Sequence, residues 1–204
     1  MPGEPGDTLC LDFANTLSWR GRLQPAESLG EYGDLIKWSI AHGVIDTSAA
    51  ARLRAVASTR PADARRVLRR ALSLREAIYR LLTARSAGSS PSAGDLRTLD
   101  RAHRRAIIHR RLIHSTDGFE WVWEGVDAAL DGPLWIVAHV AAETLVSERL
   151  ADVRACADEE CRWLFLDRSR NHSRRWCDMS DCGNRAKARR FSARRRERKS
   201  AGSS

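Results

Sequence analysis

The chain has 204 residues, of which 43% are hydrophobic and 30% are charged. This composition is typical of a globular protein and excludes a disordered or membrane-embedded chain. No apolar run approaches the roughly 20 residues that a membrane-spanning helix needs. The segment Met1–Asp7 has neither the cationic nor the apolar region of a secretory signal. We therefore expect a cytoplasmic protein with no membrane partner.

Helical periodicity dominates the first half of the chain, where apolar residues recur at every third or fourth position. It predicts five helices, over Leu9–Leu17, Leu29–His42, Ala49–Ser58, Ala62–Ala84 and Asp95–Ala106. Asp46–Ser48 offers an N-cap for the third of these helices. The small residues of Ser86–Ala93 predict a flexible connector before the fifth.

The period changes after residue 106, where alternating apolar residues predict a β-hairpin. Its strands are Ile107–His114 and Phe119–Trp123, and Asp117–Gly118 is a favourable turn between them. A further helix, Leu134–Leu150, carries too many apolar residues to be a purely solvated helix. The predicted fold class is mainly α with one β-hairpin (α+β), and residues 1–152 form the mainly helical domain.

This helical domain is predicted to sense a small-molecule effector or to form a homodimer. The candidate residues for an effector pocket are polar or aromatic and close in sequence: Asp12, Asn15, Trp19 and Arg20. The alternative is that Asp12 and Asn15 tie loops to a core of apolar neighbours. Three tryptophans, Trp121, Trp123 and Trp135, suit either a pocket or a core or interface. We expect Cys10 to be a small buried hydrophobe.

The remaining four cysteines form two close pairs with the spacing Cys-x4-Cys-x15-Cys-x4-Cys. In a reducing cytoplasm such clusters are more often metal ligands than disulfides. We predict a structural zinc ion (Zn²⁺) held by Cys156, Cys161, Cys177 and Cys182, with backbone amides bonded to the sulfurs and no open coordination position. Trp163–Leu166 is a candidate strand between the pairs, and His172 is an alternative ligand.

Almost all of the net charge lies after the last cysteine. The whole chain carries +9, and the stretch Gly183–Lys199 contains nine cations and one anion. A local excess of this kind is typical of a segment that binds a polyanion. A helix is predicted from Asn184 onward, because asparagine favours an N-cap and the following residues favour helix. We expect Phe191 and Ala188 to pack this helix on the zinc site.

Residues of this helix and of the preceding loop are the candidate nucleic-acid contacts. They are Arg174, Arg175, Asn184, Arg185, Lys187, Arg189, Arg190 and Arg194. Arginine binds phosphates and pairs with guanine, so Asn184 and Arg185 are the candidate base contacts, although Asn184 also suits a helix cap. The prediction is DNA binding. Two alternatives stay open: an RNA-binding protein, and a zinc-stabilised adaptor whose basic tail docks on an acidic protein.

Residues 153–199 are thus predicted to form a zinc finger with a basic helix, and residues 200–204 a disordered tail. No nucleophile–base pair and no phosphate-cradling glycine loop stands out in the sequence. We therefore expect a binding protein rather than an enzyme.

The segment from Cys156 to Lys187 resembles the CGNR zinc finger, which is named for the residues at 182–185. The N-terminal part resembles the ABATE domain that usually precedes this finger. That likeness rests on Leu11–Thr16, Trp19, the Trp121-x-Trp123 hairpin and Pro133–Trp135. Together the resemblance covers nearly the whole chain. It implies a stress-related bacterial transcription regulator whose zinc is held by the four matching cysteines.

Overall fold

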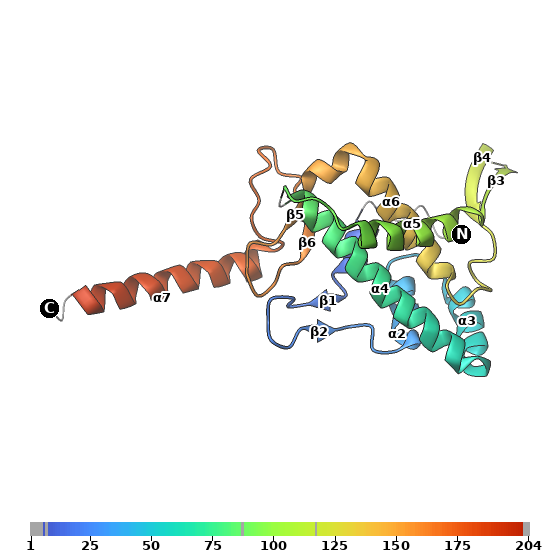
Figure 1. The fold of residues 1–204 in the computed structure, drawn as a ribbon, viewed down its shortest axis with the longest axis horizontal. Coiled ribbons are helices and arrows are strands. Elements are labelled where there is room, and N and C mark those ends of the chain that lie inside the picture. The colour runs from blue at the N-terminus through green and yellow to red at the C-terminus, as the bar shows by residue number, and fades with distance from the viewer. Residues whose placement is uncertain (1–5, 7, 87, 117, 202–204) are drawn as a thin grey trace.

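The computed structural model describes residues 6, 8–86, 88–116 and 118–201, without the side chains of 193, 194 and 196–201. Its described helices form a packed body from which a hairpin of β3 (Arg110–Ser115) and β4 (Gly118–Trp123) and the helix α7 (Asn184–Ala201) project at opposite ends (Figure 1). The helices of the body are α1 (Leu9–Ala14), α2 (Tyr32–Ala41), α3 (Thr47–Thr59), α4 (Pro61–Ser86), α5 (Ala93–Ile107) and α6 (Gly132–Val146). The mainly helical fold with a hairpin, predicted from the sequence, is confirmed.

Helix α4 is the centre of this body and packs against α1, α2, α3, α5 and α6. Its apolar residues repeat at helical spacing, so one side of the helix is buried along most of its length. Val67, Ala71, Leu74, Ile78 and Leu81 are all at most 6% exposed. In Figure 1, α4 runs from the α3 end of the body to the end that carries strands β5 (Val153–Ala155) and β6 (Leu164–Leu166). One rigid element therefore joins the two ends of the molecule.

Helix α1 is almost wholly buried, since five of its six residues are at most 2% exposed. Cys10 is fully buried and its Sγ lies 3.4 Å from Thr144 Oγ1. Burial raises the pKa of the Cys10 thiol to about 11. Cys10 is therefore an inert core residue, as expected from the sequence.

Side-chain caps set the beginnings of three helices. Asp46 accepts a hydrogen bond from the backbone amide of Ala49 at 2.7 Å, as predicted for the start of α3. Ser92 accepts from two amides at the start of α5, and Glu31 and Asp34 form a capping box on α2. Each cap satisfies amide groups that a helix leaves without an internal acceptor.

Helix α2 (Tyr32–Ala41) is shorter than the predicted Leu29–His42, and two further helices end several residues before their predicted ends. Helix α1 ends at Ala14, and Leu17–Ser18 forms the short strand β1, which pairs with β2 (Ala26–Glu27). Helix α6 ends at Val146 and is followed by the 3₁₀ helix η1 (Glu148–Asp152). In both cases the apolar pattern of the sequence continues past the helix end. The residues that follow adopt another conformation and make their contacts there.

The hairpin consists of β3 (Arg110–Ser115) and β4 (Gly118–Trp123). Asp117, the first half of the predicted turn, lies outside the described residues, and Gly118 has the positive φ of +116° that favours glycine. The aromatic face is largely open to solvent, since Phe119 is 77% and Trp121 56% exposed. Trp123 packs partly on the core, and Trp135, on α6, is 4% exposed.

Among the described residues, no helix is both long and apolar enough to cross a membrane.

Candidate metal centre and nucleic-acid interface

The C-terminal part is a small hairpin followed by a helix. Strand β5 (Val153–Ala155) pairs antiparallel with β6 (Leu164–Leu166), which confirms most of the strand predicted at 163–166. A short π-helical turn, η2 (Met179–Gly183), leads directly into α7 (Asn184–Ala201). Helix α7 includes Ser200 and Ala201, which the sequence placed in a disordered tail; residues 202–204 lie outside the described residues.

Two pairs of cysteines are brought together by these elements. Cys156 directly follows β5, Cys161 lies in the turn before β6, Cys177 precedes η2 and Cys182 is within it. All four Sγ atoms lie within 4.8 Å of one another, and Cys177 Sγ is 3.6 Å from both Cys161 Sγ and Cys182 Sγ. Zinc–sulfur bonds of about 2.3 Å in a tetrahedron require sulfur–sulfur distances of roughly 3.8 Å. The geometry therefore fits one Zn²⁺ ion.

The surroundings of the sulfurs also fit a metal-bound thiolate cluster. The backbone amides of Asp158 and Trp163 donate to the sulfurs of Cys156 and Cys161, two residues earlier in each case. Arg185 Nη2 donates to Cys182 Sγ at 2.9 Å. Such donors orient ligands and offset their negative charge. Crowding by the neighbouring sulfurs raises the pKa of Cys177, so four thiolates at this spacing need a cation between them.

The four cysteines thus form a closed site for structural zinc, in which every tetrahedral position has a protein ligand. His172, the alternative ligand, lies elsewhere: its ring is exposed and its Nδ1 is 3.1 Å from Asp152 Oδ1. Zinc at this site would cross-link the β5–β6 hairpin to the start of α7.

The zinc site is attached to the helical body at several points. Asn15 hydrogen-bonds to the backbone of Leu164 in β6, and Tyr79 Oη donates to the Arg162 carbonyl at 3.0 Å. Trp19 packs against the cluster of buried cysteines and Phe165. The finger is therefore held on the body by side chains from α1, α4 and the β1 region.

The sequence model of the ABATE family, described as "Putative stress-induced transcription regulator", matches residues 7–148, more than half of the chain. The chain belongs to the ABATE family. The model of the CGNR zinc finger matches residues 153–195, which include all four cysteines. No protein of curated function gives a significant match.

Half of the candidate nucleic-acid contacts are used inside the CGNR finger. Arg185 Nε is 3.0 Å from Asp158 Oδ2, and the same guanidinium pairs with Asp181 and lies over the Trp19 ring. Arg189 reaches both Asp158, at 3.1 Å, and Glu160, at 3.0 Å. Because the Asp158 carboxylate is fully buried, these two arginines are structural and turn toward the finger rather than away from it.

Arg174 and Asn184 are also committed to the finger. Arg174 donates to the backbone carbonyl oxygens of Trp176 and Cys177 and lies over the Phe165 ring. Asn184 Nδ2 donates to the Ser180 carbonyl at 2.8 Å, which joins the π-helical turn to α7. Asn184 has helical backbone angles and its side chain donates rather than accepts, so it is not the N-cap that the sequence predicted for α7.

The other candidates face outward. Arg175 and Arg190 both lie over the Trp176 ring, at 5.5 and 6.0 Å from its centroid, and both are exposed. Lys187 is exposed and makes no ion pair within the described part of the chain. The side chain of Arg194 lies outside the described residues.

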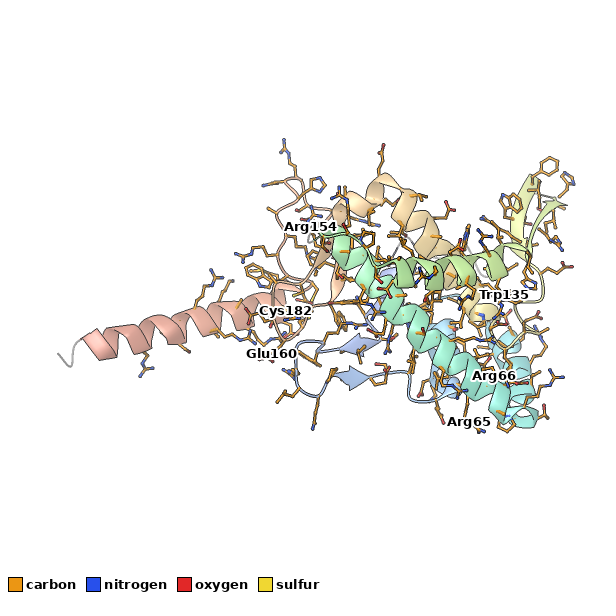
Figure 2. The ribbon with its side chains drawn as sticks, viewed as in Figure 1. Arg65, Arg66, Trp135, Arg154, Glu160 and Cys182 are labelled. Carbon is orange, nitrogen blue, oxygen red and sulfur yellow. The ribbon has the colours of Figure 1, made fainter. Side chains whose placement is uncertain are left out.

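Phe191 and Ala188 do not pack on the ABATE protein's finger, contrary to expectation. Phe191 is 70% exposed, and Ala188 is exposed as well. Helix α7 leaves the finger after its first turns, so the later residues have no surface to pack against (Figure 1). Figure 2 shows Cys182 and Glu160 together at the root of this projecting helix.

The candidate effector residues near the start of the ABATE domain are engaged with other parts of the protein. Arg20 binds Glu76 and the Ala14 carbonyl and lies 3.8 Å over the Tyr79 ring centroid. Asp12 accepts a hydrogen bond from Thr8 Oγ1 at 2.8 Å. Asn15 and Trp19 contact the finger, as described above. All these contacts fit the alternative that these residues hold parts of the protein together rather than line an effector pocket.

Asp158 is the functional residue that sequence reasoning missed. It lies in the acidic segment between Cys156 and Cys161, and its charge complements the two arginines of α7. The acidic residues between two zinc ligands, in a chain that also contains a basic helix, could have indicated this ion pairing from the sequence.

Proposed function

We propose that this ABATE-family protein is a cytoplasmic transcription regulator that binds duplex DNA through its CGNR finger and α7. The observation that carries the proposal is the division of cations on α7. Arg185 and Arg189 face the finger, whereas Lys187 and Arg190 face solvent. The family description supports a regulatory role.

The outward cations lie along one side of the helix. Position 190 follows 187 by three residues, and position 194 follows 190 by four, so the three positions share a face. Arg175, from the loop before Cys177, adds to this face through the shared Trp176 ring. The result is a row of charges that a phosphate backbone can neutralise.

The dimensions of α7 also suit duplex DNA. Its 18 residues span about 27 Å. A helix with side chains is about 10–12 Å across, which matches the roughly 12 Å width of the major groove. The described contacts of α7, with the finger and with Trp19, come from its first two turns, so its outer turns are free to enter such a groove.

Zinc has a structural role in this proposal, since it supplies a closed cross-link and no coordination position for a substrate. The ligands Cys177 and Cys182 hold the root of α7, and Asp158 holds its first turns through two arginines. The finger therefore sets the direction of the helix. We propose a binding protein rather than an enzyme, and the closed zinc site supports this in so far as it offers no position for a substrate. A homodimer stays a prediction.

The proposal is tested by fluorescence anisotropy of labelled duplex DNA with the zinc-loaded full chain over a range of salt concentrations. Removing the charges of Lys187 and Arg190 in a K187A/R190A double variant should weaken binding roughly ten- to thirtyfold and reduce the salt slope by about two. Thermal stability should stay near that of the unmodified chain, because both side chains are exposed.

The matched control removes two arginines at the opposite end of the body. Arg65 and Arg66, at the start of α4, are exposed and lie far from α7 (Figure 2). Equal weakening by an R65A/R66A variant, or binding that does not depend on salt, would contradict the proposed surface. Tighter binding to a single-stranded RNA competitor would replace DNA by RNA as the target.

A further inference from the structure

The ABATE domain contains a cavity that neither the finger nor its helix uses. It has a volume of about 310 Å³ and lies between α4, α5 and the beginning of α6. This volume is at the lower end of the range of small-molecule sites. The four residues that the sequence predicted for an effector pocket are not among its lining residues.

The rim of the cavity is cationic. Arg70 from α4, Arg101 and Arg105 from α5, and a single acid, Asp131, line it. Asp131 forms ion pairs with Arg70, at 3.7 Å, and with Arg105, at 3.6 Å, and both distances are longer than a hydrogen bond. Arg101 has no ion-pair partner among the residues that the structure describes. Three arginines and one aspartate therefore line the space, so positive charge is in excess there.

The floor of the cavity is apolar. Leu74, Leu134 and Trp135 line it and are at most 6% exposed. The Trp135 ring is held flat against His109, with ring centroids 3.6 Å apart and planes 3° from parallel. Trp135 also carries a buried indole N–H that has no acceptor among the described residues. Figure 2 places Trp135 at the end of the body away from α7.

From this arrangement we infer that the ABATE domain binds a small organic anion, a carboxylate with a flat apolar body. The arginines supply paired donors that match the geometry of a carboxylate. The leucines and the tryptophan ring remove the apolar part of the ligand from water. A free inorganic anion would use the rim and leave the floor uncovered.

The inference is independent of DNA binding, because the cavity is separate from the finger. It is tested by isothermal titration of the zinc-loaded full chain with benzoate as the probe. Neutral benzamide, which has the same shape, and inorganic phosphate, which has only charge, are the comparison ligands. Benzoate should bind in the millimolar range or better, and each comparison ligand at least tenfold more weakly.

Two variants locate the binding in the cavity. R101A removes an exposed rim cation and should weaken benzoate binding at least tenfold while the fold is kept. R104A is the matched control: Arg104 is the exposed neighbour on α5, pairs with Asp100 and does not line the cavity. Its benzoate affinity should equal that of the unmodified chain.

A third variant tests the apolar floor. A102L places a larger side chain from α5 into the cavity and should reduce benzoate binding more than phosphate binding. No benzoate binding at millimolar concentration, equal loss in R101A and R104A, or phosphate that binds as tightly as benzoate would each overturn the inference. A change of the Trp135 indole resonance with benzoate, assigned with a W135F variant, would support it.

Discussion

The side-chain amide of Asn15 is bonded to both backbone polar groups of Leu164: Nδ2 donates to the carbonyl oxygen and Oδ1 accepts from the amide, each at 2.9 Å. This pair joins the end of α1 to strand β6 of the zinc finger. A residue near the start of the chain thus completes hydrogen bonds of a strand far along it. The CGNR finger is therefore part of the same packed structure as the ABATE domain.

Replacing Asn15 by leucine should loosen the attachment of the finger. The change removes both hydrogen bonds and leaves a part-buried amide and carbonyl without partners, which costs about 1–3 kcal/mol. The measurement is urea unfolding of the zinc-loaded chain. An N171L variant is the control, because Asn171 is an exposed asparagine of the finger loop. Equal stability of the two variants would show that the Asn15 link contributes nothing.

Gly21 is required where the β1–β2 loop meets the finger. Its amide donates to the Glu160 carbonyl at 3.1 Å, and a Cβ at this position would lie 1.7 Å from the Glu159 carbonyl oxygen. Backbone atoms on both sides cannot move independently, so G21A should destabilise the protein by about 1–3 kcal/mol. A thermal unfolding comparison with G6A checks this, because a Cβ on Gly6 meets nothing within 4 Å. A G21A protein as stable as G6A would contradict the close contact.

Features that depend on local spacing could be predicted from the sequence. The zinc ligands and the long helix α4 belong to this class, since close cysteine pairs and a helical apolar period are visible within short windows. The partners of Arg185 could not be predicted in this way. Asp158 is 27 positions away, and only the folded finger brings the two together. The local charge of the sequence indicated the basic helix. It could not show which of its cations are paired inside the finger and which face solvent.

The end of α1 shows the same limit. Leu17 continues the apolar period of Leu9 and Phe13, so the sequence predicts a helix through it. The chain instead leaves the helix after Ala14, where Asn15 binds β6 and Leu17 joins β1. A tertiary hydrogen bond outweighs the weak local preference for helix.

Zinc removal should expose four cysteines and leave the fifth protected. The described structure places all four finger sulfurs in one cluster, whereas Cys10 is fully buried in the helical core. Bound zinc blocks thiolate chemistry at its ligands. Alkylation with iodoacetamide, counted by mass spectrometry, should therefore give no modified cysteine with zinc and four after chelation. A fifth should appear only in denaturant. Modification of Cys10 together with the ligands would show that zinc also holds the ABATE domain folded.

Glu27 and Arg75 should make stability depend on pH. Arg75 is 3% exposed, and its guanidinium donates to both Glu27 carboxylate oxygens, at 2.6 and 2.7 Å. Burial raises the pKa of Glu27, but the hydrogen bonds from Arg75 and the Leu29 amide outweigh it, so the pKa lies below its usual value of 4.5. The stabilisation is then complete above about pH 4.5 and is lost as the pH falls through the lowered pKa.

An E27Q variant should therefore be less stable than the unmodified chain at neutral pH, on the order of 2 kcal/mol for the loss of a half-buried charged pair. The difference should shrink as the pH falls below about 4.5, because protonation removes the same charge from the unmodified chain. Taking the difference between two zinc-loaded proteins at each pH cancels the effect of acid on the zinc site. Urea unfolding between pH 7 and 3 measures this difference in stability. The control is E120Q, at an exposed position of β4. A difference in free energy of unfolding that stays constant with pH would mean that Glu27 stabilises the fold by packing rather than by its charge.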